Sequence, residues 1–357
     1  MKCPSASSWV CLAASSFFLF CCIGTVNMTE AVSRPRPLHW PTLTPGWRLA
    51  LLLTLVVFAI ALYLTWDIKA SLAFTLKYRS KKLITLLLVG FSVSTATLLF
   101  QTLSQNRILT PGIMGFDALY VLIQSILVLT LGVIGFNTLN PYMKWGMETA
   151  LMILAMLMMY RLLFRGNQQS LQFMMLAGII FGVLFSSGSA LVFRLLDPTQ
   201  FGVLQDALFA TFAAVDPILL QISFGVLAVT AVALWRTHAR LDVMLLGQNS
   251  ATSLGLNYNA MVLMILLLVA ILVSLSTALV GPVSFFGLLV VHLAYRLAGS
   301  YQHRFLIPFA ALLGMLTLVS GEFILQHLTN FSTRLSIIIE FFGGLFFLAL
   351  IIRQGKA

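Results

Sequence analysis

Long apolar runs separated by short polar segments fill the chain from residue 48 to residue 353. Most runs are close to the roughly 20 residues that an α-helix needs to cross a bilayer, and they break at proline, glycine or charged positions. The pattern predicts ten spans, near residues 48–66, 83–101, 115–136, 147–165, 172–193, 216–236, 258–282, 284–297, 305–326 and 335–353. The eighth run is short and rich in glycine, so we expect a broken or half-crossing helix buried in protein.

Composition strengthens this picture. Of the 357 residues, 60% are hydrophobic and only 9% are charged, whereas roughly 25% of a soluble domain is charged. This composition excludes a soluble monomer and indicates an all-α, polytopic membrane protein. The chain contains no GxxxxGK[ST] sequence, so any ATP would be hydrolysed by another subunit. We therefore expect no enzyme and no catalytic residue in this chain.

The formal net charge of +11 comes from Lys and Arg residues scattered between the apolar runs. They form no basic stripe, so nucleic-acid binding is not expected. If the segment before residue 48 is cytoplasmic, ten crossings place both termini inside, and 13 of the 21 Lys and Arg residues fall on that side, as the positive-inside rule requires. Five of the exceptions lie in one external loop, which makes it a candidate docking surface: Lys69, Lys77, Arg79, Lys81 and Lys82.

The first 47 residues form a separate segment, followed by a permease domain over 48–353 and a cytoplasmic tail over 354–357. An apolar run precedes Met28 and could be a leader, with Met28 as the true start, or an eleventh helix. The charge rule favours the leader. All four cysteines lie in the first 22 residues, so we expect no thiolate metal site and no metal ligands in the permease domain.

The polar segment 237–257 carries the sequence LGQNSATSLGL over residues 246–256. Small residues closed by Gly255 indicate a short helix, and an ordinary loop is the alternative. The pattern LGxxxAxxLGL resembles the coupling-helix loop of the iron-siderophore and vitamin B12 permeases of ABC importers, the FecCD family.

Three further stretches resemble this family in the right order. They are KYRSKKL (77–83), QNRILTPGIMG (105–115) and GPVSFFGLLVVHL (281–293). The last is similar to the family pattern GPIxFxGLxxPHL. The chain departs from the family at Val291, Arg107, Glu322, Leu345 and the segment 332–336. These departures resemble the second permease of heterodimeric ferric-siderophore systems.

The resemblance implies a type II ABC importer permease fold with an inverted repeat of helices 2–5 and 7–10. It also implies three groups of functional residues. The residues coupled to the ATPase would be Leu246, Gly247, Ala251, Leu254 and Gly255. Those that dock a binding protein would be Arg79, Lys82 and Arg334. Small residues that either pack helices closely or line the substrate path are Ser92, Ser94, Thr95, Ser276 and Thr277.

The implied protein is a permease subunit of the bacterial inner membrane, with a cytoplasmic C-terminus, that imports a ferric siderophore. Its partners would be a homologous permease, an ABC ATPase dimer that binds ATP-Mg, and a periplasmic or lipid-anchored binding protein. The chain itself would bind no cofactor. Alternatives are a vitamin B12 or haem permease, a membrane scaffold, and a proton-coupled carrier that uses the intramembrane carboxylates Glu322 and Glu340.

Other polar or sulfur-bearing positions have simpler interpretations. Asp117 and Glu148 lie at predicted span ends, where we expect them to be solvated. Pairs such as Met158-Met159 could form a thioether copper path, but packing or lipid contact is the simpler role in such apolar runs. His292 is expected to be a structural, hydrogen-bonding histidine.

Overall fold

The computed structural model describes residues 44–66, 72–163, 171–209, 211–212, 215–328 and 335–354. The predicted leader and the predicted docking residue Arg334 lie outside these ranges. The described ranges contain α-helices, one short 3-10 helix and no strand. The elements are α2 (Pro45–Thr65), α3 (Leu72–Ser104), η1 (Pro111–Met114), α4 (Phe116–Thr138), α5 (Pro141–Leu163), α6 (Leu171–Phe193), α7 (Pro198–Leu208), α8 (Pro217–Met244), α9 (Gln248–Ser253), α10 (Tyr258–Val280), α11 (Phe286–Leu297), α12 (His303–Leu328) and α13 (Leu335–Gln354).

Each predicted span corresponds to one helix, so the all-α, multi-pass architecture is confirmed. Seven of the described helices are long and apolar enough to cross a membrane. They are α2, α3, α4, α6, α8, α10 and α12. Helix α5 has 23 residues, and α11 has only 12, in agreement with the predicted half-crossing element.

Three features of the helices differ from the prediction. Helix α3 begins at Leu72 and α8 continues to Met244, whereas the predicted spans begin at 83 and end at 236. Lys and Arg end an apolar run, but they favour helix almost as well as leucine does, so the helices extend beyond the predicted apolar core. Helix α7 was not predicted. It begins at Pro198, where the Gln200 side chain accepts a hydrogen bond from the Asp197 backbone N–H at 3.2 Å, as in one half of a capping box.

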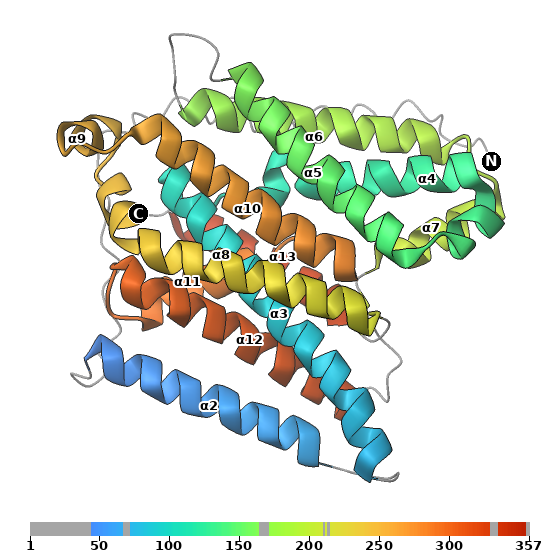
Figure 1. The fold of residues 1–357 in the computed structure, drawn as a ribbon, viewed down its shortest axis with the longest axis horizontal. Helices are drawn as coiled ribbons and strands as arrows, with labels where there is room; N and C mark the ends of the chain where they lie inside the picture. The colour runs from blue at the N-terminus through green and yellow to red at the C-terminus, as the bar shows by residue number, and fades with distance from the viewer. Residues whose placement is uncertain are drawn as a thin grey trace, which may run out of the picture. The chain divides into compact units, whose positions relative to one another are not determined.

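Helices α3 and α12 form an antiparallel pair near the centre of the described fold (Figure 1). Helix α3 also packs against α10 and α11. At the closest approach of the pair, a methyl group on Gly90 would lie only 2.9 Å from the Gly314 carbonyl carbon. Side chains that are fully buried at this crossing include Leu86 and Val89. The absence of a β-carbon at both glycines therefore allows the two backbones to touch, as in closely packed membrane helices.

A second group of helices consists of α4, α5 and α6, with η1 at its base and α7 at its edge (green in Figure 1). Gly115 has a φ of +94° and links η1 to α4. A methyl group on Gly115 would lie 2.6 Å from the Gly182 Cα atom of α6. Helix α10 packs against both α3 and α5 and so joins the two groups.

Candidate functional site

The predicted short helix in the polar segment is present as α9, a six-residue helix that follows α8. Gly247 begins it with a φ of +90°, and Gly255 follows it with a φ of +81°. The Gly255 N–H donates to the Thr252 carbonyl at 2.9 Å, and the Leu256 N–H donates to the Ala251 carbonyl at 3.0 Å. Glycine is favoured at both ends because other residues rarely adopt positive φ.

The exposed surface of this segment is mostly polar, but it includes two leucines. Leu246 is 60% exposed and Leu254 is 64% exposed, whereas Ala251 is fully buried against the rest of the chain. Isolated exposed leucines are ordinary on a protein surface. Here the two leucines flank a short helix that has glycine at both ends.

The end of α8, just before α9, is connected to two other helices by a chain of hydrogen bonds. Asp242 Oδ1, near the end of α8, accepts from the His303 backbone N–H at 2.8 Å and lies 2.6 Å from His303 Nδ1. Because a carboxylate only accepts, Nδ1 carries the proton. His303 Nε2 lies 2.8 Å from Thr102 Oγ1 of α3. Gln105, at the end of α3, donates to the Met244 carbonyl at 3.4 Å.

This chain therefore connects α8 with α3 and α12, five residues before Gly247 begins α9. His303 is fully buried, while the Asp242 side chain is 36% exposed. The sequence analysis did not identify either residue, because they lie 61 positions apart and match no local motif.

At the opposite end of α3, the predicted docking residues have partners within the chain. Lys82 forms an ion pair with Glu322 of α12, in which the two side chains are 11% and 4% exposed. Gln326 donates to the same carboxylate at 3.1 Å and to the Tyr63 hydroxyl at 3.2 Å. Arg79 donates to the Tyr63 carbonyl at 3.1 Å and to the Trp66 carbonyl at 2.6 Å, where α2 ends.

Two other lysines of the predicted external loop, which the structure places at the start of α3, remain on the surface. Lys77 and Lys81 are exposed and lie four positions apart on α3, so their side chains share one face of the helix. In the described part of the chain neither ammonium group has an ion pair. The accessible positive charge at this end therefore belongs to Lys77 and Lys81 more than to Lys82.

The predicted path or packing residues are all buried between helices. Ser92, Ser94 and Thr95 are fully inaccessible, and Ser276 and Thr277 are 2% and 4% exposed. The Ser94 hydroxyl donates to the Gly90 carbonyl at 2.6 Å, one turn earlier in its own helix. In this conformation these hydroxyls lie at closed helix interfaces.

Two carboxylates expected to be solvated are instead enclosed. Glu148 is 1% exposed and accepts a hydrogen bond from Gln124 at 2.6 Å, so that prediction was wrong, because α4 supplies a donor inside the fold. Asp117 accepts from the Ser284 hydroxyl at 2.7 Å and lines a small polar cavity with Ser276 and Thr277.

An open groove of about 420 Å³ lies between the η1–α4 turn and α6, and the sequence analysis did not identify it. Ser186, Ser187 and Ala190 of α6 form its exposed wall. Its other lining residues are Gly112, Ile113, Gly115, Ala118, Ile179, Gly182 and Val183. The run of small residues SSGSA at 186–190, inside an otherwise apolar helix, was the available signal. Among the described residues, no group of three or more His, Cys, Asp or Glu side chains could hold a metal ion.

The span-forming helices, the short helix α9 and the open groove define a multi-pass membrane permease. The chain belongs to the FecCD transport family, whose model matches residues 48–353. This match covers nearly all of the apolar part of the sequence.

Individual relatives extend this result. The chain is 40% identical, over 310 residues, to the petrobactin import system permease protein YclO of Bacillus subtilis. The matched region covers 87% of this chain and 98% of that protein. It is 35% identical to the petrobactin import system permease protein FatC of Bacillus anthracis over 78% of both chains. A vitamin B12 import system permease protein, BtuC of Serratia proteamaculans, is 26% identical over 76% of this chain and 79% of that protein.

A solved structure supports the fold independently. It is an inward-facing metal-chelate type ABC transporter with a TM-score of 0.74 at 20% sequence identity. The match covers 87% of this chain and 99% of that chain. At this identity, the likeness establishes the type II ABC importer permease fold.

Proposed function

We propose that the chain is the membrane-spanning permease subunit of an ABC importer that carries a ferric siderophore into the cell. The observation that carries this proposal is the 40% identity to a petrobactin import permease over 98% of that protein's length. The chain would lie in the bacterial inner membrane with its C-terminus in the cytoplasm, as the distribution of Lys and Arg favours.

The chemistry of ATP would belong to a partner. A dimer of ATPase subunits would bind ATP-Mg and hydrolyse it, and this chain would bind no cofactor. Helix α9 is suited to receive the resulting movement, because glycines fix both its ends and Leu254 projects from its surface. The Asp242–His303–Thr102 chain would then transmit a displacement of α9 to α3 and α12.

A periplasmic or lipid-anchored binding protein would dock at the other end of α3. The FecCD resemblance points to Arg79, Lys82 and Arg334 for this contact. Exposed ion pairs contribute about 0.2–1 kcal/mol each, which suits a receptor that must dock and leave. Lys77 and Lys81 are the accessible cations at this end, so we include them in the proposed docking surface.

The substrate would pass between this chain and a homologous permease. The groove along α6 supports this proposal, because small residues on one wall, Ser186, Ser187 and Ala190, leave open space of about 420 Å³. A wall of Ser and Ala side chains tolerates water and a bulky solute without holding either tightly. Ser186, Ser187 and Ala190 would therefore line the path in the assembled transporter.

The alternative substrates use the same scaffold, and vitamin B12 permeases are among the relatives at lower identity. A proton-coupled carrier would need a carboxylate that is free to bind and release protons within the membrane. Glu322 already has Lys82 and Gln326 as partners. This arrangement favours a structural role for Glu322 over a role as a proton relay.

The proposed function is tested by uptake of radioactive iron in a strain that lacks the gene. Loss of ATP-dependent uptake of iron loaded on petrobactin, with rescue by the wild-type gene, is the expected result. Normal iron uptake together with lost cobalamin uptake would mean that the protein is a vitamin B12 permease. Uptake by the purified chain alone under a proton gradient would overturn the ABC importer proposal.

A further inference from the structure

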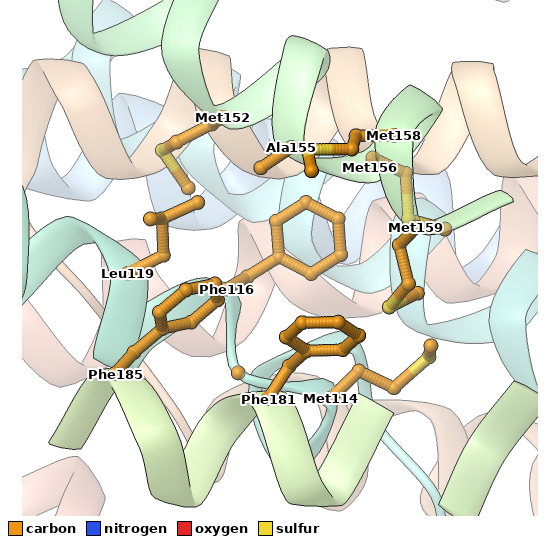
Figure 2. A pocket seen from close by; sticks show the side chains of 11 residues that line it. Met114, Phe116, Leu119, Met152, Ala155, Met156, Met158, Met159, Phe181 and Phe185 are labelled. Carbon is orange, nitrogen blue, oxygen red and sulfur yellow. The ribbon is translucent and has the colours of Figure 1, made fainter. Parts of the chain in front are cut away.

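A cavity of about 170 Å³ lies between η1, α4, α5 and α6, and almost all of its surface is apolar. Its walls are thioether and aromatic side chains, as Figure 2 shows. The lining side chains are Met114, Phe116, Leu119, Met152, Ala155, Met156, Met158, Met159, Phe181 and Phe185. Met152 and Met156 are buried, whereas Met158 is 61% exposed, so Met158 forms part of the rim where the cavity meets the outer surface.

The chemistry of this lining selects its occupant. An apolar cavity of about 150 Å³ stays dry and takes up small hydrocarbons, because no polar group repays the hydrogen bonds that water would lose. Methionine adapts its shape to an apolar guest and contacts aromatic rings favourably. Around a helix of a membrane-spanning chain, the abundant apolar molecules are lipid acyl chains.

A metal ion is a poorer occupant. The run of methionines could suggest a thioether site for a soft metal. Figure 2 shows the ring of Phe116 between Met152 and Met159. Met152 and Met159 are therefore separated by an aromatic ring, so they do not converge on a common point.

A positive charge lies beside the rim. Arg161 is exposed in the last turn of α5 and lies three positions after Met158, so the two side chains are neighbours on the helix surface. Arg161 has no ion pair within the described residues. A phosphate group held by this guanidinium would leave its acyl chain at the entrance of the cavity.

We propose that the Met/Phe cavity is a binding site for one acyl chain of an anionic phospholipid, with Arg161 contacting the phosphate. This site is separate from the substrate groove, but the two share a wall. Gly115 lines both, and Phe181 of the cavity is followed by Gly182 of the groove. A bound acyl chain therefore supports the contact between η1 and α6 from behind and resists collapse of the groove wall into the cavity.

The test uses the full transporter in vesicles of phosphatidylcholine with a minor fraction of phosphatidylglycerol whose acyl chain carries a photoactivatable diazirine. After illumination, the labelled peptides are mapped by mass spectrometry. We expect adducts on cavity residues such as Met156 and Phe181. Ala155→Trp fills the cavity and should abolish these adducts, with Ala155→Leu as a milder variant if the first does not fold.

The matched control is Leu154→Trp, which adds the same ring to the neighbouring position on α5. Leu154 is 61% exposed and does not line the cavity, so labelling of the cavity should be unchanged. Arg161→Gln should reduce the preference for phosphatidylglycerol over phosphatidylcholine by about five-fold.

Two results would overturn the proposal. Adducts that are equally abundant at Leu154 and in the cavity, and that persist in Ala155→Trp and Ala155→Leu, would mean general contact with the surrounding lipid. Absence of adducts on the cavity residues, with labelling of Leu154 retained, would mean that no acyl chain enters the cavity.

Discussion

Lys82 and Glu322 illustrate how strongly a single contact depends on the fold. The two residues are 240 positions apart and form an ion pair that is almost removed from solvent. Each charge would be costly in this environment without the other. Gln326 donates to this carboxylate and also to the Tyr63 hydroxyl, so these contacts link α2, α3 and α12 at this end.

Removing the ammonium group should therefore destabilise the protein. We expect Lys82→Met to lower the free energy of unfolding by about 3–5 kcal/mol, because it leaves a buried carboxylate without its counter-charge. Denaturant titration of the purified protein in detergent measures this change in the free energy of unfolding.

The neighbouring lysine provides the control. Lys81→Met removes the same charge from an exposed position one residue earlier, and its effect should lie within about 0.5 kcal/mol. Equal destabilisation by the two substitutions would mean that the Lys82–Glu322 ion pair does not contribute in the membrane protein.

Individual helices were predictable where a local pattern defines them. The ten spans follow from apolar length, and α9 follows from small residues closed by Gly255. The added lengths of α3 and α8 did not follow, because charged residues end an apolar run without ending a helix. The tie between Asp242 and His303 also lay beyond prediction, since no sequence rule relates the end of α8 to the start of α12.

Helix α9 should be separable from the stability of the permease. Leu254→Asp places a charge on the exposed leucine that ends this helix, so we expect loss of the co-purifying ATPase with no change in melting temperature. Leu195→Asp is the matched control, because Leu195 is 63% exposed and lies after α6, outside the coupling segment. ATPase recovery that is equal for both variants would contradict the proposed contact.

The hydrogen-bond chain below α9 makes a different prediction. Asp242→Asn weakens a charge-assisted bond to His303, which is worth about 1.5–3 kcal/mol. We expect ATP hydrolysis to continue while less substrate is imported per ATP, because α9 is no longer firmly linked to α12. Proteoliposomes that report both rates measure the ratio, and an unchanged ratio would mean that movement is transmitted by another route.

At the scale of the whole molecule, the small residues that the sequence predicted either to pack helices or to line the path are enclosed in this conformation. Hydroxyl-rich stretches of α3 and α10 were the visible signal, but Ser92 and Ser276 are enclosed. The open groove lies along α6 and is lined there by Ser186 and Ser187. Its opposite wall is formed by η1 and the start of α4, which are distant from α6 in the sequence. A groove between distant segments is a property of the assembled fold.

This assignment predicts a selective block of transport. Ser187→Trp fills part of the groove, so siderophore uptake should fall more than about ten-fold, while assembly with the ATPase is retained. Leu184→Trp is the control on the same helix, since Leu184 is 60% exposed and does not line the groove. Normal uptake by Ser187→Trp would place the path elsewhere.

The antiparallel pair of α3 and α12 keeps one register from end to end. Lys82 meets Glu322, Gly90 touches Gly314, and Thr102 meets His303. Twenty positions separate Lys82 from Thr102 in α3, a length of about 30 Å at 1.5 Å per residue. Sliding of one helix along the other would break both terminal contacts and drive the Gly90 backbone into Met315. In the proposed importer, these three contacts would couple a displacement at the α9 end of the pair to the lysine-bearing end on the other side of the bilayer. Release of the proposed binding protein would then depend on events at the opposite membrane surface, with no signal needed from the solute in transit.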